Sequence, residues 1–524
     1  MSSATDFEKI FQRLMKLDNL ARYADARAME ALGSLIDLSS DLGRGDGLDK
    51  ALAWCDELEQ RPLKGTDIPT LDYFRANAWH ARQRTKHRDP NIAWSWDQPE
   101  ALEQIRFLRR ATRHPGFENL DAVRRAQIFT NLANLLNSLG RFVEAVPMWS
   151  RALSVNPRFG MALGNRGLGL SEYGRRLYDD GHTDVFLLFA HKDLIAALSP
   201  DADYAGYPDD DAKAACAQKQ KQIERLIDCA AVQKSLHMDG YSLGDSPEEQ
   251  NYRRWVLDNG LFLNPLNDLG RHSISAEEIF GLPSFTTKID EPPTLIGLFN
   301  QMKQEYISAR WMLYDGMEAD TPHFADRGVT LPNTLDYPSY SIAVEKVKAA
   351  FRIAYSLFDK IAFFLNDYAK LRVNPRQIYF KTIWYDNQDW KRGIRKEFLN
   401  SRNWPLCGLY WLSRDLFDAE LQATAEPDAQ ELYIIRNCLE HSYLKVHEIL
   451  LPPTGPSDLF LDRLAFSVQR EEFFRRTLRV LKLARAALIY LSLGMHHEEL
   501  QRPPSKNGLV APMVLGLWED EWKF

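Results

Sequence analysis

The sequence predicts an all-α protein in which a row of helical hairpins precedes a helical bundle with long inserted connections. Apolar residues recur at steps of three and four along most of the chain, as amphipathic helices require. Alternation with period two is rare, and residues 377–384 are the main candidate for a strand. Long helices are expected at residues 294–315, 340–369, 428–450 and 458–493.

The clearest hairpin spans residues 126–159 and fits the 34-residue tetratricopeptide pattern. Gly140 is expected to form the turn and Pro157 to end the second helix. The apolar positions of the two helices are Leu132, Ala133, Leu136, Ala145, Trp149 and Ala152. A hairpin of this kind cannot bury its apolar face alone, so neighbouring hairpins should stack on it. Such a stack has a concave surface, for which we expect a protein or peptide ligand. The sequence leaves a nucleic acid there as an alternative.

The chain divides into three regions. About four hairpins of the tetratricopeptide type are expected in residues 20–200. Residues 201–250 are more polar and predict a linker or a bracing helix, and residues 251–524 predict the helical bundle. A chain of 524 residues is long enough for more than one core.

Composition excludes several classes of function. The net charge of -7 argues against a protein that coats nucleic acid through bulk charge, so any RNA contact should be a local patch. The five cysteines are widely spaced and form no C-x-x-C pair, so they predict neither disulfides nor a zinc site. We expect no metal and no cofactor, because adjacent His496 and His497 point about 100° apart on a helix and no phosphate-binding loop is present.

The location of the protein is predicted from two stretches of sequence. The first residues lack the basic and apolar pattern of a signal peptide. The longest late apolar run, residues 486–495, is too short to span a bilayer. We therefore expect a cytoplasmic protein without membrane segments.

The strongest candidate for chemistry is the group Arg436, Asn437 and His441 on one predicted helix. An arginine keeps its charge and can bind a phosphate with two hydrogen bonds, while a histidine can take and give a proton near neutral pH. Together they suit metal-free cleavage of a phosphodiester. The spacing alone is not specific, since it recurs at Arg75/His80, Arg82/His87 and Arg109/His114. Only the late match has an asparagine directly after the arginine.

The helix geometry predicts how these residues could act together. Arg436 and His441 lie about 140° apart around a helix axis, so one helix cannot easily direct both at one atom. Two copies that face each other could do so. Glu440 stands four residues after Arg436 and is expected to orient the guanidinium, although a plain surface salt bridge would use the same spacing.

The motif Arg436, Asn437 and His441 resembles the signature of the HEPN superfamily, which is an arginine, a polar residue and, a few residues later, a histidine on a helical bundle. Residues 252–268 are a second point of similarity. The resemblance implies a homodimeric, metal-independent endoribonuclease that leaves a 2′,3′-cyclic phosphate. It also implies a toxin or antiviral defence effector, regulated through its repeats. Tyr443 occupies the position that a nucleotidyltransferase modifies in some HEPN toxins.

Residues 370–404 are the best candidate for holding RNA. They contain nine Lys or Arg residues against three acidic ones, interleaved with aromatic rings. Cations bind phosphates and flat rings stack on unpaired bases. The candidate RNA-binding residues are Trp384, Trp390, Arg392, Arg395 and Lys396. In the alternative interpretation, the rings fill the core and the charges are solvated.

A second basic stretch lies on the last long helix. Arg475, Arg479 and Lys482 share one face of that helix, and we expect this face to be solvated.

Two further functions are compatible with the sequence. The chain could be a non-catalytic scaffold or dimerisation protein in which the motif is a structural remnant. It could also be a target that a nucleotidyltransferase modifies at Tyr443. The first alternative predicts that Arg436 and His441 can be replaced without any loss of activity.

Overall fold

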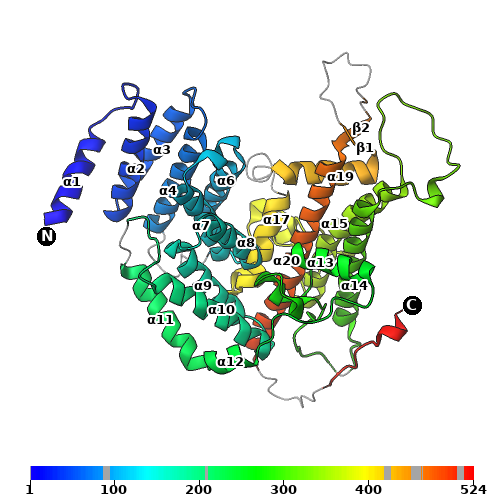
Figure 1. The fold of residues 1–524 in the computed structure, drawn as a ribbon. Coiled ribbons are helices and arrows are strands. Elements are labelled where there is room, and N and C mark those ends of the chain that lie inside the picture. The colour runs from blue at the N-terminus through cyan, green and yellow to red at the C-terminus, as the bar shows by residue number, and fades with distance from the viewer. Residues whose placement is uncertain are drawn as a thin grey trace.

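The computed structural model describes residues 2–86, 95–206, 210–288, 290–417, 427–449, 462, 464–503 and 513–523. The protein is mostly helical, with paired helices in the N-terminal half and a helical C-terminal region (Figure 1). Within the described residues, no helix has the length and apolar character needed to cross a lipid bilayer.

The N-terminal half is a row of helices that pack mainly against their neighbours in sequence, on the left of Figure 1. They are α1 (Ser2–Met15), α2 (Asp25–Asp41), α3 (Gly45–Glu59), α4 (Asp67–Lys86), α6 (Pro99–Arg113), α7 (Ala122–Ser138), α8 (Phe142–Val155), α9 (Gly160–Gly174) and α10 (Asp180–Leu198). The connecting helices α11 (Asp210–Leu226), α12 (Cys229–Ser235) and α13 (Pro247–Asp258) follow.

The hairpin expected over residues 126–159 corresponds to α7 and α8. Asp121 caps α7 by accepting a hydrogen bond from the Arg124 backbone N–H at 2.9 Å. Gly140 has φ +80°, which allows the chain to turn between the two helices. The apolar positions that the pattern singled out are buried: Leu132, Ala133, Leu136, Ala145, Trp149 and Ala152. The local sequence therefore determined this hairpin well.

The C-terminal region surrounds one long helix, α20 (Arg470–Gln501). Residues 483–495 of this helix are all buried, as expected of a helix with neighbours on every side. Its neighbours include α14 (Thr294–Glu318), α15 (Ile342–Tyr368), α17 (Trp404–Phe417) and α19 (Pro427–His441), while α16 (Lys396–Leu399) is a single turn. α19 lies across the end of this bundle (Figure 1).

Short 3-10 helices interrupt the connections. They are η1 (Pro115–Asn119), η2 (Pro265–Asp268), η3 (Ser273–Ser275), η4 (Phe324–Asp326), η5 (Pro375–Gln377), η6 (Asp386–Gln388), η7 (Trp390–Arg392) and η8 (Asp520–Trp522).

The structure departs from a purely helical fold directly after the motif. The helix expected over 428–450 ends at His441, and β1 (Tyr443–His447) follows. β1 pairs in parallel with β2 (Ala465–Gln469), with Tyr443 opposite Ala465 and His447 opposite Gln469. The last long helix begins at Arg470 rather than at residue 458, and residues 458–461 lie outside the described residues. The strand expected at 377–384 is instead η5 followed by turns.

One apolar core extends from α4 through the later N-terminal helices into the bundle around α20, while α1 to α4 bury a smaller core of their own. The backbones of the α7–α8 turn and of α17 meet at Gly140 and Gly408. A Cβ at Gly140 would overlap the carbonyl oxygen of Trp404, and one at Gly408 would overlap that of Gly140. The N-terminal helices and the bundle therefore contact each other at backbone distance.

Candidate functional site

Helix α19 positions the motif by burying one side against the bundle. Leu432, Ile435 and Leu439 are buried at steps of three and four, and α19 contacts α15, α17 and α20. Glu431 forms an ion pair with Arg476 of α20. The motif residues therefore lie on α19 outside the row of side chains that is buried against the bundle.

Arg436 and Asn437 lie side by side at the junction with α15. The Arg436 Nη1 donates a hydrogen bond to the Asn437 Oδ1 at 3.1 Å. Burial raises the pKa of Asp359 on α15, and the nearby Arg436 charge opposes this shift. Burial likewise raises the pKa of Tyr355, again against the Arg436 charge. Among the described residues, the buried Tyr355 hydroxyl has no hydrogen-bond partner. The guanidinium is thus held near α15 and remains partly exposed.

His441 is exposed at the last position of α19. In the part of the chain that the structure describes, no hydrogen bond or ion pair engages its imidazole. Arg436 therefore lies toward α15 while His441 lies toward solvent, in agreement with their separation of about 140° around the helix. One chain does not direct both groups at a common point.

Glu440 does not pair with Arg436, contrary to the sequence expectation. Its Oε1 lies 3.9 Å from the Nε of Arg352 on α15. The Arg352 guanidinium also donates a hydrogen bond to the Leu439 carbonyl oxygen at the end of α19. Arg352 is thus a second cation beside the motif. No local sequence pattern points to Arg352, because it is 84 positions from Arg436 and only the packing of α15 on α19 brings the two together.

An ion-pair network holds the loop after α14 against β1, next to His441. The Lys445 Nζ lies 2.6 Å from Asp336 and 2.8 Å from Asp462. Burial lowers the pKa of Lys445, but these hydrogen bonds outweigh it and raise that pKa. Leu335 and Tyr337, which flank Asp336, have φ values of +66° and +51°. Such conformations cost free energy in residues other than glycine, so the network keeps this loop in a strained shape.

Tyr443 begins β1 two residues after His441. Its ring is 41% exposed, and its hydroxyl donates a hydrogen bond to Asp462. This bond raises the pKa of Tyr443. A modification of the hydroxyl oxygen would require the bond to break.

Two of the candidate RNA-binding residues need correction. Trp384 is fully buried, with its ring centroid 5.2 Å from that of Phe398 and 5.8 Å from that of Tyr410. Arg395 is buried as well, and its Nε donates to the Ile383 carbonyl oxygen at 2.9 Å. Neither side chain can meet a ligand without local unfolding, because both contribute to the core.

The other three candidates are accessible. Trp390 is 70% exposed, and Arg392 and Lys396 are exposed as well. They belong to η7 and α16, in the connection between α15 and α17. Of the five candidates, two are thus buried, while one ring and two cations are exposed.

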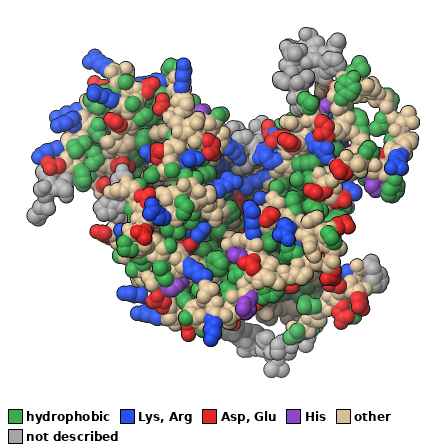
Figure 2. All heavy atoms as spheres, in the orientation of Figure 1, with side chains coloured by type: hydrophobic (Ala, Val, Ile, Leu, Met, Phe, Trp, Pro, Cys, Tyr) green, Lys and Arg blue, Asp and Glu red, His purple; other side chains and the backbone are tan. Residues whose placement is uncertain are grey.

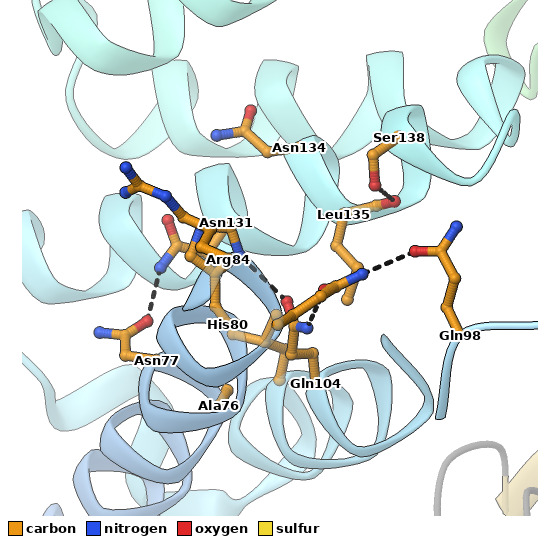
Figure 3. Close-up of a pocket in the computed structure, with 12 residues that line it drawn as sticks. Ala76, Asn77, His80, Arg84, Gln98, Gln104, Asn131, Asn134, Leu135 and Ser138 are labelled. Atoms are coloured by element: carbon orange, nitrogen blue, oxygen red, sulfur yellow. Dashed lines mark hydrogen bonds between the residues drawn. The ribbon is translucent and has the colours of Figure 1, made fainter. Parts of the chain in front are cut away.

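The N-terminal helices contain a pocket of about 320 Å³ between α4, α6 and α7 (Figure 3). Burial lowers the pKa of His80 in its wall, so the imidazole is neutral near pH 7. Asn131 and Asn77 face each other in the pocket, and the Asn131 Nδ2 donates to the Asn77 Oδ1 at 2.9 Å (Figure 3). Carboxamides dominate the lining: Asn77, Gln83, Gln98, Gln104, Asn131 and Asn134. Apart from the cation of Arg84, this surface offers neutral donors and acceptors.

Within the described residues, no cluster of three or more His, Cys, Asp or Glu side chains could hold a metal ion. The Nδ1 of His497 lies 3.2 Å from the Nη1 of Arg176. A cation at that distance is a poor neighbour for a metal ion, because the two positive charges would repel each other.

The comparisons identify the C-terminal region. Residues 286–498 match the family model described as LA2681-like HEPN. The match contains α14, α15, α17, α19, both strands and most of α20, and therefore all the motif residues. The chain matches no curated protein and no solved structure. HEPN domains are a family of ribonucleases. The protein is thus a mostly helical chain that contains an LA2681-like HEPN domain in residues 286–498.

Proposed function

We propose that this protein is a metal-independent endoribonuclease that acts as a homodimer. The observation that carries the proposal is the arrangement on α19. A half-buried Arg436 is held by Asn437 and an exposed His441 lies one turn further along, both inside the HEPN domain. The net charge of -7 requires that RNA contacts be local, which fits a site of this size.

The reaction is a transesterification within RNA. His441 removes the proton from a ribose 2′-OH, and the 2′-oxygen attacks the adjacent phosphorus. The guanidinium of Arg436 stabilises the negative charge that grows on the phosphoryl oxygens. The bond to the 5′-oxygen breaks, and that oxygen takes up a proton from the protonated His441. The products are a 2′,3′-cyclic phosphate and a 5′-hydroxyl, and the step needs no metal or cofactor.

A dimer solves the geometric problem of the single chain. Because His441 and Arg436 face different directions on α19, each site would combine the arginine of one subunit with the histidine of the other. A two-fold axis creates two such sites per dimer. The side chain of Asn437 positions Arg436, and Glu440 positions Arg352 as an additional cation near the phosphate.

The repeats would regulate the nuclease. In this proposal, residues 20–200 form tetratricopeptide-like repeats, residues 201–250 brace them, and residues 251–524 form the nuclease region. The amide-lined pocket of the repeats is the surface for a protein or peptide ligand, because carboxamides can pair with backbone N–H and C=O groups. The biological role would be that of a toxin or defence effector, which remains inactive until the repeats meet that ligand.

The test is cleavage of end-labelled total RNA by the purified protein in EDTA. We expect the wild-type protein to produce cyclic-phosphate ends, and Arg436→Ala and His441→Ala each to reduce the rate by at least about 100-fold. Arg327→Ala and His237→Ala are matched controls, because both residues are exposed and lie outside α19. The controls should retain full activity.

Three results would count against the proposal. Equal cleavage by the wild-type protein and both motif variants would assign the activity to another site. An inactive wild-type protein, tested also with candidate peptide ligands, would favour the scaffold alternative. Transfer of a labelled nucleotide to wild-type protein but not to Tyr443→Phe would instead favour the modification target.

A further inference from the structure

The 319–341 loop, which connects α14 with α15, exposes several large apolar side chains. Figure 1 shows this loop projecting beside β1 and β2, and Figure 2 shows hydrophobic side chains on the surface of the same part of the molecule. Exposed fractions between 50% and 74% are found for Phe324, Val329, Leu331, Leu335, Tyr337 and Tyr340. Single exposed apolar residues are common on protein surfaces, but a group of this size indicates an interaction surface.

Lys445 of β1 fixes part of this loop beside the strands. Its Nζ binds Asp336 at 2.6 Å, and Asp336 stands between Leu335 and Tyr337 in the sequence. Further along the loop, the backbone N–H of Ser339 donates a hydrogen bond to a β1 carbonyl oxygen at 2.7 Å. The exposed side chains of Leu335 and Tyr337 are therefore held at the strand that directly follows the motif helix α19.

Asp462, the second partner of Lys445, brings further apolar side chains to this place. Its carboxylate accepts hydrogen bonds from the Tyr443 hydroxyl and from the Leu464 backbone N–H, and both side chains are exposed. Tyr340 of the loop is close enough to Tyr443 for the two hydroxyl groups to interact electrostatically. The five exposed side chains gathered in this way around Lys445 are called the apolar patch: Leu335, Tyr337, Tyr340, Tyr443 and Leu464.

The loop exposes two members of the patch at a conformational cost. Leu335 and Tyr337 have φ values of +66° and +51°, in the left-handed region that residues other than glycine and asparagine rarely adopt. Burial of the two side chains does not offset this strain, because each is at least 60% exposed. Backbone strain is concentrated at functional sites, so a strained loop that holds apolar side chains in water indicates that they bind something.

The charges around the patch favour a protein partner over RNA. Exposed rings can stack on bases, but RNA binding also needs cations for the phosphates. Lys445 is buried and already paired with two carboxylates. The loop itself carries more acidic than basic side chains, with Arg327 against Asp320, Asp326 and Asp336. An apolar surface with few cations matches the core of a protein interface, where charged residues are depleted.

We propose that the apolar patch is the contact with a second copy of this chain, and that this contact brings His441 of one copy toward Arg436 of the other. This inference rests on the proposed nuclease function and assigns its dimer interface. The two motif side chains lie on different sides of α19, so the site needs a second motif beside the first. Tyr443 of the patch comes two residues after His441, so two patches in contact place two motifs close together.

Symmetry also selects a second copy as the partner. A two-fold axis brings the same surface of both subunits together, so that surface must be complementary to itself. Apolar side chains meet this condition, because they are buried equally well against their own copies. A cluster of like charges would repel its copy, but the charges of Lys445, Asp336 and Asp462 inside the patch are paired with one another.

The test measures self-association separately from cleavage. Sedimentation equilibrium gives the dissociation constant of the dimer for the full-length wild-type protein and for a triple variant with Leu335→Asn, Tyr337→Asn and Leu464→Ser. Asparagine tolerates a positive φ, so the triple variant should fold. At a concentration where both proteins are monomeric, its unfolding temperature should be no lower than that of the wild type. We expect the dissociation constant to rise at least about tenfold.

The matched control removes the same residue types elsewhere. It carries Leu226→Asn, Tyr241→Asn and Leu500→Ser, which change three exposed side chains outside the patch. Its dissociation constant should differ from that of the wild type by less than about twofold. Hydrogen exchange provides a second measurement, because a dimer that buries the patch should slow exchange in the 319–341 loop as the concentration of wild-type or control protein rises. The triple variant should show no such slowing over the same range.

The outcomes separate this interface from the nuclease proposal. If the triple variant dimerises as tightly as the wild type, the interface is wrong and the nuclease stands. A wild-type protein that is monomeric at every concentration would also overturn the interface, and the cleavage assay would decide separately on the nuclease. Unchanged self-association with weaker binding of labelled RNA would assign the patch to RNA instead. If dimerisation falls as expected but the wild-type protein never cleaves RNA, the interface stands and the nuclease fails.

Discussion

Asp415 of α17 binds Arg109 of α6 through two hydrogen bonds of 2.5 and 2.8 Å and thereby joins the HEPN domain to the N-terminal helices. Arg141 adds a third bond to the same carboxylate at 2.6 Å. All three side chains are buried. Burial opposes ionisation of Asp415, but the two arginine charges outweigh it and hold its pKa far below the ordinary value. The contact between the two regions thus contains a charged group with no access to water.

Replacement of Asp415 by Asn should destabilise the protein by about 3–5 kcal/mol, because it leaves two buried arginines without their shared counter-ion. The free energy of unfolding in urea measures the effect. Asp97→Asn is the control, since Asp97 pairs with the neighbouring Arg414 at 3.0 Å but is mostly exposed. The Asp97→Asn change should lower the free energy of unfolding by less than about 1 kcal/mol. Similar losses for the two variants would contradict the role of the buried contact.

Gly140→Ala should destabilise the protein more than Gly65→Ala. Both glycines have positive φ, so each alanine costs about 1–2 kcal/mol of backbone strain. Gly65 has open space around it, whereas a methyl group at Gly140 would overlap the Trp404 carbonyl oxygen. The overlap should add about 1–3 kcal/mol, measured by urea unfolding. Equal effects would show that the turn and α17 can move apart at little cost.

Arg436→Ala and His441→Ala should complement each other when they are mixed. A composite site takes the arginine from one subunit and the histidine from the other, so a mixed dimer contains one intact site of two. Random exchange makes half of the dimers mixed, and we expect about one quarter of the wild-type cleavage rate. The measurement is RNA cleavage after subunit exchange has been verified by native mass spectrometry. No recovery in verified mixed dimers would mean that one chain provides both groups.

Lys482→Gln should stabilise the free protein in a pH-dependent way. The folded pKa of about 8 lies below the unfolded value near 10.4, so the unfolded chain holds the proton more strongly. The protonated Lys482 therefore lowers the free energy of unfolding by its full amount below pH 8. This loss of stability disappears as the pH rises toward about 10.5. The advantage of the variant, measured by urea unfolding, should be largest at pH 7 and shrink by pH 10. Lys234→Gln should show no such trend, and a constant difference for Lys482→Gln would be inconsistent with a depressed pKa.

Local sequence patterns predicted the helices well where neighbours in sequence are also neighbours in space. The α7–α8 hairpin follows from Gly140 and the small and large apolar positions around it, because those residues pack within the hairpin. The same reasoning failed after His441. Apolar residues at 444 and 446 fit a helix as well as a strand. The strand forms because it pairs with Ala465–Gln469, and the sequence around residue 444 gives no sign of that partner.

The sequence predicted residues for a candidate site but little of their geometry. The sequence identified α19 as the helix with the motif, and the HEPN match covers it. No local pattern shows that Trp384 is buried, because the ring of Trp96, which packs beside it, is almost 300 positions away in the sequence. For the same reason the sequence predicted an ion pair of Glu440 with Arg436, whereas Glu440 lies beside Arg352. It also predicted that Lys482 is solvated, whereas Lys482 is partly buried. Long-range packing decides each of these cases.

The separate small core of α1 to α4 has a consequence for how such proteins can diverge. Helices α1 to α3 bury their apolar faces against one another and against one side of α4, so they can be replaced as a block while α4 is kept, because Tyr73 and Ala76 of α4 belong to the main core. The later helices cannot be exchanged in this way, because Gly140 and Arg109 fit the particular backbone and carboxylate of α17. Sequence change should therefore accumulate in the first three helices, while the helices next to α17 are inherited together with the HEPN domain.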